Sequence, residues 1–379
     1  MNHHAVTLCI TGGHATPAIA VADEVKRRHP DWEIVWIGRH TALEGSRFLS
    51  EEFSLVTERD IRFLPLTAGR LTRVWHVQTL VSLAKIPYGF FQAFRYCARE
   101  KFDCIVSFGG YIALPVAVAG WLLGIPVITH EQTRIPGFAN RIIGFIAQRI
   151  CINFAESATF FAMRKTVEIG LPLRKKLFHP SKTNSIGVAV NKPVLYVTGG
   201  STGAVSLNEL LFSIVGQLTK DWSIIHQTGH VSFDYAIKTK QALPKERQSR
   251  YLIKPYVSED ELSWIYAHAR MVIARAGANT VGELAALGKV SVLIPLPWSS
   301  YQEQQMNAEW LVEAGSAVVL DQKKITPQLF IEIVRQMTKD FDNYQNNADC
   351  FSSKIPRDAD KRMVKEIEEL VVSCTEKLS

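Results

Sequence analysis

With 379 residues, the chain is longer than one ordinary globular core, and its length predicts two domains of typical size. Hydrophobic residues make up 47% of the sequence and charged residues 21%, which excludes disordered and fibrous proteins. The 43 Lys and Arg residues outnumber the 36 Asp and Glu residues, and the net charge of +7 favours anionic partners such as phosphates, anionic lipids or nucleic acids.

The first predicted strand covers residues 5–10 and leads into Thr11-Gly12-Gly13-His14. No basic segment and no long apolar run precede it, so we expect no signal peptide. The six cysteines lack C-x-x-C spacing, and several lie within apolar runs. This pattern favours free thiols in a reducing compartment over a zinc site or a disulfide framework.

Residues 75–94 are rich in apolar and aromatic side chains, and basic residues flank them. The apolar set is Trp75, Val77, Leu80, Val81, Leu83, Ile86, Tyr88, Phe90, Phe91 and Phe94, and the basic set is Arg62, Arg70, Arg73, Lys85, Arg95 and Arg99. An element that lies on an anionic membrane surface has this composition, but so does an ordinary core helix with an aromatic stripe. Both interpretations stay open at this point.

The stretch 111–129 is the one candidate for a membrane-spanning segment. Pro115, Gly120, Gly124 and Pro126 interrupt it. We therefore expect a helix of small residues followed by a strand, and no spanning helix.

The second half of the chain repeats the pattern of the first. Residues 194–197 lead into Thr198-Gly199-Gly200-Ser201 as residues 5–10 lead into the first glycine turn. Residues 104–107 and 271–274 form a second matched pair of strand-like runs, and each is followed by a Gly-containing turn and an Ala-rich helix. Strand-like runs that alternate with amphipathic segments predict α/β domains with parallel sheets. Two Rossmann-like, doubly wound domains follow from this pattern.

A Gly-Pro cluster at Gly170-Leu171-Pro172 marks the join between the domains. We place an N-terminal domain at residues 1–171 and a C-terminal domain at 172–354, with a helix over about residues 355–379 as a candidate to pack back on the first domain. Open α/β sheets bind ligands at the carboxyl ends of their strands, so two domains that face each other would share one central cleft.

Each Gly-Gly turn lies where a strand passes into a helix. Backbone N–H groups in such a turn, together with the helix dipole, suit a phosphate, although a tight turn without a ligand has the same sequence. Neither turn is a complete dinucleotide or Walker motif. Two matched turns in matched halves favour phosphate binding.

Polar residues at strand ends are the candidates for catalysis. His14 follows the first turn and could act as a general base, or it could be a surface or capping histidine. His130-Glu131-Gln132 ends the predicted strand 125–129, where it either faces a ligand or forms a hydrogen-bonded network at the start of a loop.

The segment 275–283 has the same strand–turn–helix setting in the second half. Glu283 could hold a ribose diol or act only as an acid in the helix dipole. The polar cluster of Gln302, Gln304, Gln305 and Asn307 suits sugar hydroxyls or forms a polar loop. Two D-x-D patterns, at 340–342 and 358–360, do not follow apolar strands, so we interpret both as solvated faces and expect no metal site.

These motifs resemble, in order, those of the MurG family of bacterial glycosyltransferases with the GT-B fold. The resemblance runs from Thr11 to about Leu320 and rests on Thr11-Gly12-Gly13-His14-x-x-Pro17, Gly109-Gly110-Tyr111, His130-Glu131-Gln132, Gly170-x-Pro172-x-Arg174, Gly199-Gly200-Ser201-x-Gly203-Ala204, Gly277-Ala278-x-Thr280-x-x-Glu283 and Gln304-x-x-Asn307-Ala308. It implies transfer of N-acetylglucosamine from UDP-N-acetylglucosamine to lipid I, which gives lipid II in peptidoglycan synthesis and so serves cell-wall biogenesis, cell shape and cell division.

The resemblance also implies roles for individual residues. The acceptor would bind at Gly12, Gly13, Tyr111, His130, Glu131 and Gln132. The donor would bind at Thr11, Gly12, Gly13, Thr133, Arg174, Ser201, Val257, Ala278, Asn279, Thr280, Val281, Gly282, Glu283 and Gln304. Within that set the Val257 backbone would contact the uracil, Glu283 the ribose, Ser201 and Arg174 the diphosphate, and Gln304 the sugar.

The mechanism implied is a single in-line displacement that inverts the anomeric carbon. His14, or alternatively Glu131, would deprotonate the acceptor hydroxyl, while backbone N–H groups, helix dipoles and Arg174 would meet the UDP charge without a metal or other cofactor. The expected partners are UDP-N-acetylglucosamine, lipid I and an anionic membrane surface, with no nucleic acid. The expected location is peripheral, on the cytoplasmic face of the plasma (inner) membrane.

The chain departs from the family pattern at several positions. Cys9-Ile10 stand where the family usually has Gly-Gly, which we expect to stiffen a phosphate turn; Thr133 and Leu171 each replace an Asn, and Glu303 replaces a His or Gln. Alternatives are a GT-B enzyme with another lipid acceptor such as a diacylglycerol, a UDP-sugar epimerase, and a UDP-sugar-binding protein without turnover.

Overall fold

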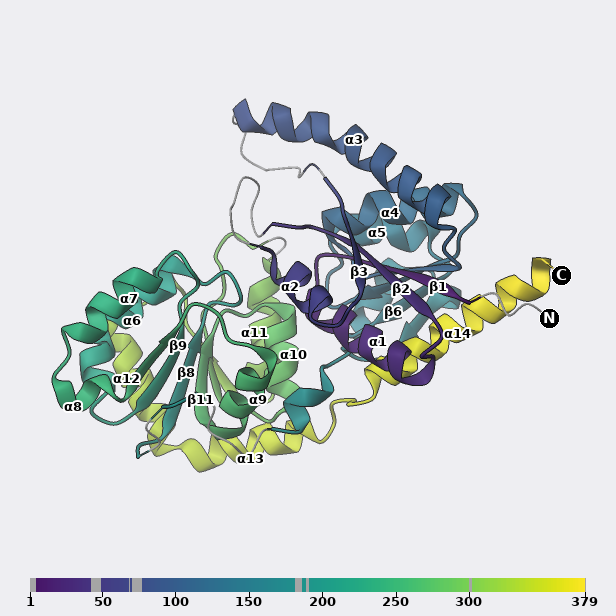
Figure 1. Ribbon diagram of the computed structural model, residues 1–379. Coiled ribbons are helices and arrows are strands. Elements are labelled where there is room, and N and C mark those ends of the chain that lie inside the picture. The colour runs from purple at the N-terminus through teal and green to yellow at the C-terminus, as the bar shows by residue number, and fades with distance from the viewer. Residues whose placement is uncertain are drawn as a thin grey trace. The chain divides into compact units, whose positions relative to one another are not determined.

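The computed structural model describes residues 5–41, 49–67, 69, 77–180, 186–188, 191–299 and 302–378. The chain divides into two compact units. Unit 1 contains residues Met1–Arg174 and Pro356–Ser379, and unit 2 contains Lys175–Ile355. Figure 1 shows that each unit has helices packed around its own sheet.

Unit 1 is built on a seven-stranded parallel sheet with the order β3-β2-β1-β4-β5-β6-β7. Its strands are β1 Thr7–Thr11, β2 Glu33–Gly38, β3 Arg62–Pro65, β4 Cys104–Ser107, β5 Val127–Glu131, β6 Arg149–Ile152 and β7 Thr166–Glu168. Its helices are α1 Ala15–Arg28, α2 Glu51–Thr57, α3 Val77–Glu100, α4 Gly110–Leu122, α5 Phe138–Ile146 and α14 Ala359–Leu378, with short 3-10 helices at Ala155–Phe160 and Met163–Lys165.

Both faces of this sheet are covered, and the alternation of side chains along β1 shows how. Leu8 and Ile10 point into a core that α1 and α14 complete, whereas Cys9 belongs to a second core with residues of α3, α4 and α5. Successive side chains of a strand point to opposite faces, so a strand buried on both sides must be apolar throughout. This is why Leu8, Cys9 and Ile10, the interior residues of β1, form a continuous apolar run.

Unit 2 repeats this architecture with a six-stranded parallel sheet, in the order β10-β9-β8-β11-β12-β13. Its strands are β8 Val194–Thr198, β9 Ser223–Gln227, β10 Tyr251–Lys254, β11 Ala269–Ala274, β12 Ser291–Leu293 and β13 Ala317–Val319. Its helices are α6 Val205–Leu218, α7 Phe233–Gln241, α8 Lys245–Gln248, α9 Glu259–His268, α10 Ala278–Ala286, α11 Glu303–Glu313, α12 Pro327–Lys339 and α13 Phe341–Ser352, with a 3-10 helix at Lys175–Phe178.

The strand orders confirm the prediction of two similar doubly wound halves. β8 occupies in unit 2 the central place that β1 has in unit 1, and β11 follows it as β4 follows β1. The matched sequence pairs therefore correspond to matched strands. In each unit the strand order reverses beside this central strand, which is where doubly wound sheets bind ligands.

The stretch 111–129 splits as predicted into a helix and a strand. α4 ends at Leu122 and β5 begins at Val127, with Gly124 in a left-handed conformation between them. None of the helices in the described part of the chain combines the length and apolar character needed to cross a bilayer.

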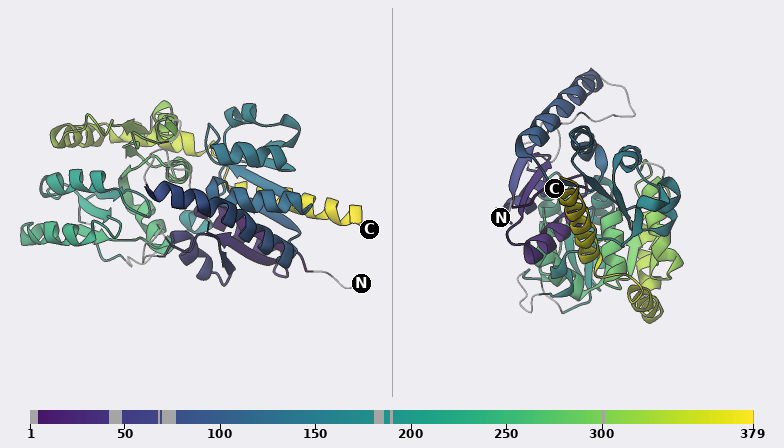
Figure 2. Two further views of the ribbon diagram at one scale, coloured as in Figure 1. Left: turned by 90° about the horizontal axis from the view of Figure 1, so that it is seen from above. Right: turned by 90° about the vertical axis from the view of Figure 1, so that its right-hand side faces the viewer.

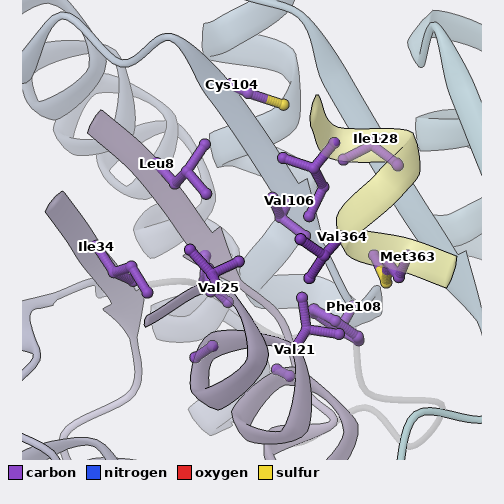
Figure 3. Packing of buried hydrophobic residues seen from close by; sticks show 14 of the residues in the cluster. Leu8, Val21, Val25, Ile34, Cys104, Val106, Phe108, Ile128, Met363 and Val364 are labelled. Atoms are coloured by element: carbon purple, nitrogen blue, oxygen red, sulfur yellow. The ribbon is translucent and has the colours of Figure 1, made fainter. Parts of the chain in front are cut away.

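Helix α14 returns from the end of the chain to complete the core of unit 1. Met363, Val364 and Ile367 are fully buried against Val21 and Val25 of α1 and against the sheet. Figure 3 shows Met363 and Val364 beside these side chains, and the views in Figure 2 show α14 running alongside α1.

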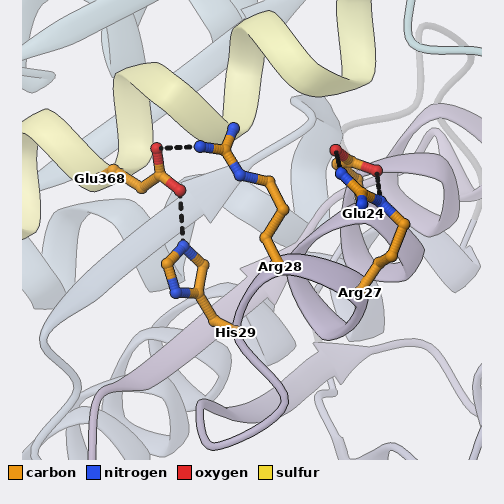
Figure 4. A network of polar contacts seen from close by, with 5 residues as sticks. All are labelled: Glu24, Arg27, Arg28, His29 and Glu368. Atoms are coloured by element: carbon orange, nitrogen blue, oxygen red, sulfur yellow. Dashed lines mark hydrogen bonds and ion pairs between the residues drawn. The ribbon is translucent and has the colours of Figure 1, made fainter.

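Polar contacts at the rim of the same interface add little to its stability. Glu368 of α14 accepts hydrogen bonds from Arg28 at 2.9 Å and from His29 at 2.5 Å, as Figure 4 shows. Ion pairs open to solvent typically contribute about 1 kcal/mol or less, whereas each buried aliphatic side chain contributes about 1.5–3 kcal/mol. The apolar face of α14 therefore holds it in place.

We predict that Ile367→Ala lowers the free energy of unfolding of unit 1 by about 2–5 kcal/mol, because it leaves a cavity at a fully buried position. Denaturant unfolding with tryptophan fluorescence would measure the change. Val372→Ala, at an exposed position of the same helix, should change it by less than about 0.5 kcal/mol. Equal losses in the two variants would contradict the assignment of α14 to this core.

Candidate functional site

The carboxyl ends of β1 and β4 form the centre of the candidate site in unit 1. Gly13 N donates a hydrogen bond to Gly109 O at 2.8 Å, which joins the two glycine turns. Gly12 has φ +146°, and a Cβ atom on it would lie 2.8 Å from the backbone of Phe108. Only glycine fits there, because any side chain would push the two strand ends apart.

His14 lies between the glycine turn and α1. It occupies the N-cap position of that helix, but its side chain makes no capping hydrogen bond and is half-buried, so it is neither a capping nor a freely exposed histidine. Burial lowers the pKa of His14 to about 4. The imidazole is therefore neutral at pH 7 and can accept a proton.

His130 is a buried side chain of β5 whose tautomer is fixed by the backbone. Its Nε2 lies 2.9 Å from Gly170 O and donates to that carbonyl, which leaves Nδ1 without a proton. The pKa of His130 is lowered to about 4, chiefly by burial; the hydrogen bond to Gly170 opposes this shift, and the nearby His14 adds to it. His130 therefore supports the fold here through Nε2, and its buried Nδ1 is left without a hydrogen-bond partner.

Glu131 is the centre of a buried hydrogen-bonded network. One carboxylate oxygen accepts from the Thr133 backbone N at 2.9 Å and from Thr133 Oγ1 at 2.7 Å, and the other accepts from Asn140 Nδ2 at 2.7 Å. Burial raises the pKa of Glu131, which is only 2% exposed. Of the two interpretations of residues 130–132, this geometry favours the network, and of the two candidate bases it favours His14.

Several buried polar atoms around this turn have no hydrogen-bond partner. They are Thr11 Oγ1, His130 Nδ1, Gln132 Oε1 and Asn140 Oδ1. Their residues are linked through Phe108 and His130: Phe108 N donates to Thr11 O, Gln132 Nε2 donates to Phe108 O, and Asn140 Nδ2 donates to His130 O. Unsatisfied buried polar groups are rare and costly in proteins, so their clustering identifies this edge as the part of unit 1 suited to a polar ligand.

The structure corrects one expectation about departures from the family pattern. Cys9 and Ile10 lie inside β1 and are fully buried, so they belong to the core and not to the phosphate turn. The turn itself starts at Gly12, and its flexibility does not depend on them. Burial of Cys9 also raises the pKa of its thiol well above the ordinary value, which keeps the thiol protonated and inert.

Unit 2 has the corresponding site at the ends of β8 and β11. Thr198 Oγ1 accepts a hydrogen bond from Gly200 N at 3.0 Å, and Thr198 O accepts one from Arg275 N at 3.3 Å. Ser201 follows in this turn and is half-buried, and α6 starts at Val205. The end of β8 is thus joined to the end of β11, as Phe108 N joins the end of β4 to Thr11 O at the end of β1 in unit 1.

Arg275 is a residue whose importance the sequence did not reveal. Its guanidinium is buried and donates to Ile294 O at 2.9 Å, to Ser206 Oγ at 2.7 Å and to Gln322 Oε1 at 2.5 Å. Burial lowers its pKa from the ordinary value, although an arginine remains charged at pH 7. The sequence shows only an arginine directly after a buried strand. It does not reveal the hydrogen bonds, because the partners come from three segments that are distant in sequence.

The predicted donor residues of α10 lie in its first two turns. The helix starts with Ala278, Asn279, Thr280, Val281, Gly282 and Glu283, after Gly277 as its N-cap. Glu283 is 5% exposed and accepts a hydrogen bond from Tyr266 OH at 3.1 Å. Asn279 Oδ1 is buried without a hydrogen-bond partner. The helix therefore presents an oriented carboxylate and an unsatisfied amide oxygen near its N-terminal end.

Gln304 and Val257 lie at the starts of helices, and Arg174 lies where the chain passes from unit 1 to unit 2. Gln304 Oε1 accepts from Leu296 N at 3.0 Å, which ties α11 to the end of β12. Val257 is buried immediately before α9, and Arg174 is buried at the end of the first segment of unit 1. These residue roles, and the central cleft that the two sets of turns would share, stay predictions.

The two D-x-D patterns differ from each other. Asp340 and Asp342 are exposed, as predicted for a solvated face. Asp360 is only 2% exposed, so the same interpretation was wrong for residues 358–360. It lies in the first turn of α14, where the helix dipole favours a carboxylate. Among the described residues, no group of three His, Cys, Asp or Glu is arranged to hold a metal ion.

Comparison with known proteins adds to this geometry. Residues 5–152 match the N-terminal domain of glycosyltransferase family 28, and residues 194–363 match its C-terminal domain. Relatives from Myxococcus xanthus and Treponema denticola are each 34% identical over 86% of this chain, which covers 82% and 86% of their lengths. Both are named UDP-N-acetylglucosamine–N-acetylmuramyl-(pentapeptide) pyrophosphoryl-undecaprenol N-acetylglucosamine transferase.

Solved structures show the same fold. The chain matches MurG of Acinetobacter baumannii with a TM-score of 0.69 and 26% identity, over 97% of this chain and all of that one (100%). A UDP-GlcNAc 2-epimerase from Neisseria meningitidis gives a TM-score of 0.68 over 96% of this chain and 99% of its own, but its identity is only 12%. The epimerase therefore shares the fold alone.

Proposed function

Because this chain belongs to the MurG family within glycosyltransferase family 28, we propose that it transfers N-acetylglucosamine from UDP-N-acetylglucosamine to the muramyl sugar of lipid I. The product is lipid II. The observation that carries the proposal is the similarity to relatives that are named N-acetylglucosamine transferases. This similarity covers most of this chain, across both units, and most of each relative. We assign the acceptor to the turns of unit 1 and the donor to the turns of unit 2.

The reaction is a single displacement with inversion at the anomeric carbon. His14 accepts the proton of the muramyl hydroxyl, since its neutral ring stands half-buried at the glycine turn while both oxygens of Glu131 have partners. Backbone N–H groups of the unit 2 turns, the α10 N-terminus and Arg174 stabilise the charge that develops on UDP. These protein groups take the role that a divalent metal has in other transferases.

The alternatives differ in their products. A transferase with another lipid acceptor, such as a diacylglycerol, would leave a lipid I analogue unchanged, and an epimerase would convert the UDP-sugar without any acceptor. A UDP-sugar-binding protein would bind UDP without product. The 12% identity to the epimerase supports only the shared fold, whereas the transferases match at 34% identity.

The test is a transfer assay with radiolabelled UDP-N-acetylglucosamine, a lipid I analogue and a chelator. We expect a labelled disaccharide lipid with or without the chelator. A chelator-dependent product would refute the metal-free mechanism only. Product from a diacylglycerol, or epimerised sugar without an acceptor, would replace the proposal by the corresponding alternative.

We predict that His14→Ala lowers kcat by roughly a hundredfold or more, as expected for a lost general base. For the unaltered enzyme, kcat/KM should fall on the acid side near pH 4, because protonated His14 cannot accept a proton and its pKa is lowered to about 4. An anionic acceptor raises the pKa of a nearby histidine, so the acid limb of kcat should lie at higher pH.

The matched control for this prediction is His179→Ala, an exposed histidine, which should keep the full rate and the same pH profile. Near-normal turnover of His14→Ala with saturating acceptor would remove His14 from the role of base.

For the donor site we predict that Glu283→Ala weakens UDP binding roughly tenfold or more, because a charged hydrogen bond to the ribose is lost. Isothermal titration calorimetry with UDP would measure it. Glu332→Ala removes an exposed carboxylate of the same unit and should leave the affinity unchanged. Equal UDP affinity of the wild type, Glu283→Ala and Glu332→Ala would argue against a contact between Glu283 and the ribose.

We further propose that unit 1 binds the cytoplasmic face of the plasma membrane as a peripheral protein. Along the described part of α3, Gly89, Ala93 and Cys97 are buried, whereas the exposed face carries Tyr88, Phe91 and Phe94 with Arg95 and Arg99. Aromatic residues that are solvated beside basic ones suit an anionic lipid surface better than a core. Arg70, Arg73 and Trp75 lie outside the described residues, as do the side chains of Val77, Leu80, Val81 and Leu83.

The membrane prediction concerns two aromatic residues of this face. Tyr88→Ser with Phe91→Ser should lower binding to anionic liposomes by roughly tenfold or more, because these side chains are 55% and 61% exposed and available to lipid. Sedimentation with liposomes would measure it. Tyr235→Ser, at an exposed aromatic of unit 2, is the control. Unchanged sedimentation of the double variant would place membrane contact elsewhere.

A further inference from the structure

The residue after β2 is a half-buried arginine that lies beside a predicted acceptor residue. Arg39 Nη1 donates a hydrogen bond to Tyr111 OH at 3.2 Å. Arg39 Nε is buried and has no hydrogen-bond partner. An arginine carries five N–H donors, so this side chain can bind an anion while it holds the tyrosine.

The backbone of Arg39 is fixed on both sides by a buried network. Arg39 N donates to Glu52 Oε2 at 3.1 Å, and Trp36 Nε1 donates to Glu52 Oε1 at 2.6 Å. Ser50 Oγ donates to Arg39 O and also caps α2. A Cβ atom on Gly38 would lie 2.1 Å from Glu52 Oε1, so glycine is needed for the carboxylate to fit. The backbone of Arg39 is therefore fixed at the end of β2, and its side chain extends from there to Tyr111.

The order of strands places this arginine at the glycine turn. β1 lies between β2 and β4, and Arg39 follows β2 while Tyr111 lies at the start of α4, directly after β4. The hydrogen bond between them therefore passes across the end of β1, where Gly12 and Gly13 lie. This edge of the sheet therefore brings together the Arg39 guanidinium, the Tyr111 phenol, the backbone of the Gly12-Gly13 turn and the N-terminal end of α1.

The direction of the hydrogen bond decides what the tyrosine can do. Tyr111 OH accepts from Arg39, so its own proton is available for another acceptor. A cationic donor polarises the hydroxyl and strengthens that second bond. The guanidinium fork in turn matches two phosphate oxygens, which a lysine cannot do.

We propose that Arg39 is a further specificity residue of the acceptor site, whose guanidinium contacts phosphate oxygens of the acceptor diphosphate and holds the Tyr111 hydroxyl toward them. The inference rests on the proposed function and adds to it a specificity residue for acceptors that carry a diphosphate.

The test compares steady-state kinetics of the full-length wild type with Arg39→Met, Arg39→Lys and Tyr111→Phe. Arg39→Met should raise KM for the lipid I analogue on the order of tenfold, with KM for UDP-N-acetylglucosamine changed by less than about twofold. Arg39→Lys keeps the charge and should lose less. In the Arg39→Met/Tyr111→Phe double variant the two effects should not add, because the residues act as one unit.

Inorganic pyrophosphate provides a readout that does not depend on the acceptor lipid. It should inhibit the wild type competitively with the acceptor, and its inhibition constant should rise on the order of tenfold in Arg39→Met. Arg59→Met is the matched control, because Arg59 is half-buried like Arg39 but lies before the amino end of β3, where it pairs with Asp23. This control variant should leave both the acceptor KM and the inhibition constant of pyrophosphate unchanged.

The outcomes separate this inference from the proposed function. An active wild type whose Arg39→Met and Tyr111→Phe variants keep both the acceptor KM and pyrophosphate inhibition would refute the inference alone. A wild type without transfer would refute the proposed function and the inference with it. If Arg39→Met does not fold, as judged by thermal unfolding, Arg39→Lys and Tyr111→Phe decide by the same two constants.

Discussion

The hydrogen bond from Gly13 N to Gly109 O holds together the two strand ends on which the candidate site of unit 1 depends. It continues the parallel ladder, in which Phe108 N donates to Thr11 O at 2.7 Å, beyond the last residues of both strands. Glycine is needed at position 12, where a Cβ atom would lie 2.8 Å from the backbone of Phe108, and at position 109, where φ is +70°. His14 and Tyr111 are positioned because their helices start directly from this joint.

In unit 2 the equivalent of the bond from Phe108 N to Thr11 O joins the ends of β8 and β11, and an arginine side chain reinforces it. Arg275 N donates to Thr198 O, and the Arg275 side chain then ties together the first turn of α6, the residue after β12 and the segment before α12. The described partners of this guanidinium are carbonyl, hydroxyl and amide oxygens, so its positive charge is not neutralised by a carboxylate. We propose the turn after β8 for the donor diphosphate, and a fixed cation beside that turn would stabilise the charge of a departing nucleotide.

The sequence predicted the features that depend on local pattern. Strands buried on both faces give continuous apolar runs, and the glycine turns follow them, so the paired halves and the split of residues 111–129 were confirmed. Other features depend on strand order and on contacts distant in sequence. Arg39 follows β2 and Tyr111 follows β4, and the two side chains meet across the end of β1, which lies between these strands in the sheet. Asp360 is buried because α14 returns to unit 1. A sequence pattern also cannot say which polar side chains after β5 turn inward, as His130 and Glu131 do.

The return of α14 makes the first unit discontinuous in the gene. Residues 175–355 leave the ribosome after the strands of unit 1 and before the helix that covers one face of them. During synthesis that face, with Leu8 and Val106, therefore stays open to water or to chaperones until residues 356–378 have been made. Unit 2 can complete its own sheet in the meantime, so the C-terminal domain is expected to reach its native state first even though it is encoded later than most of its neighbour.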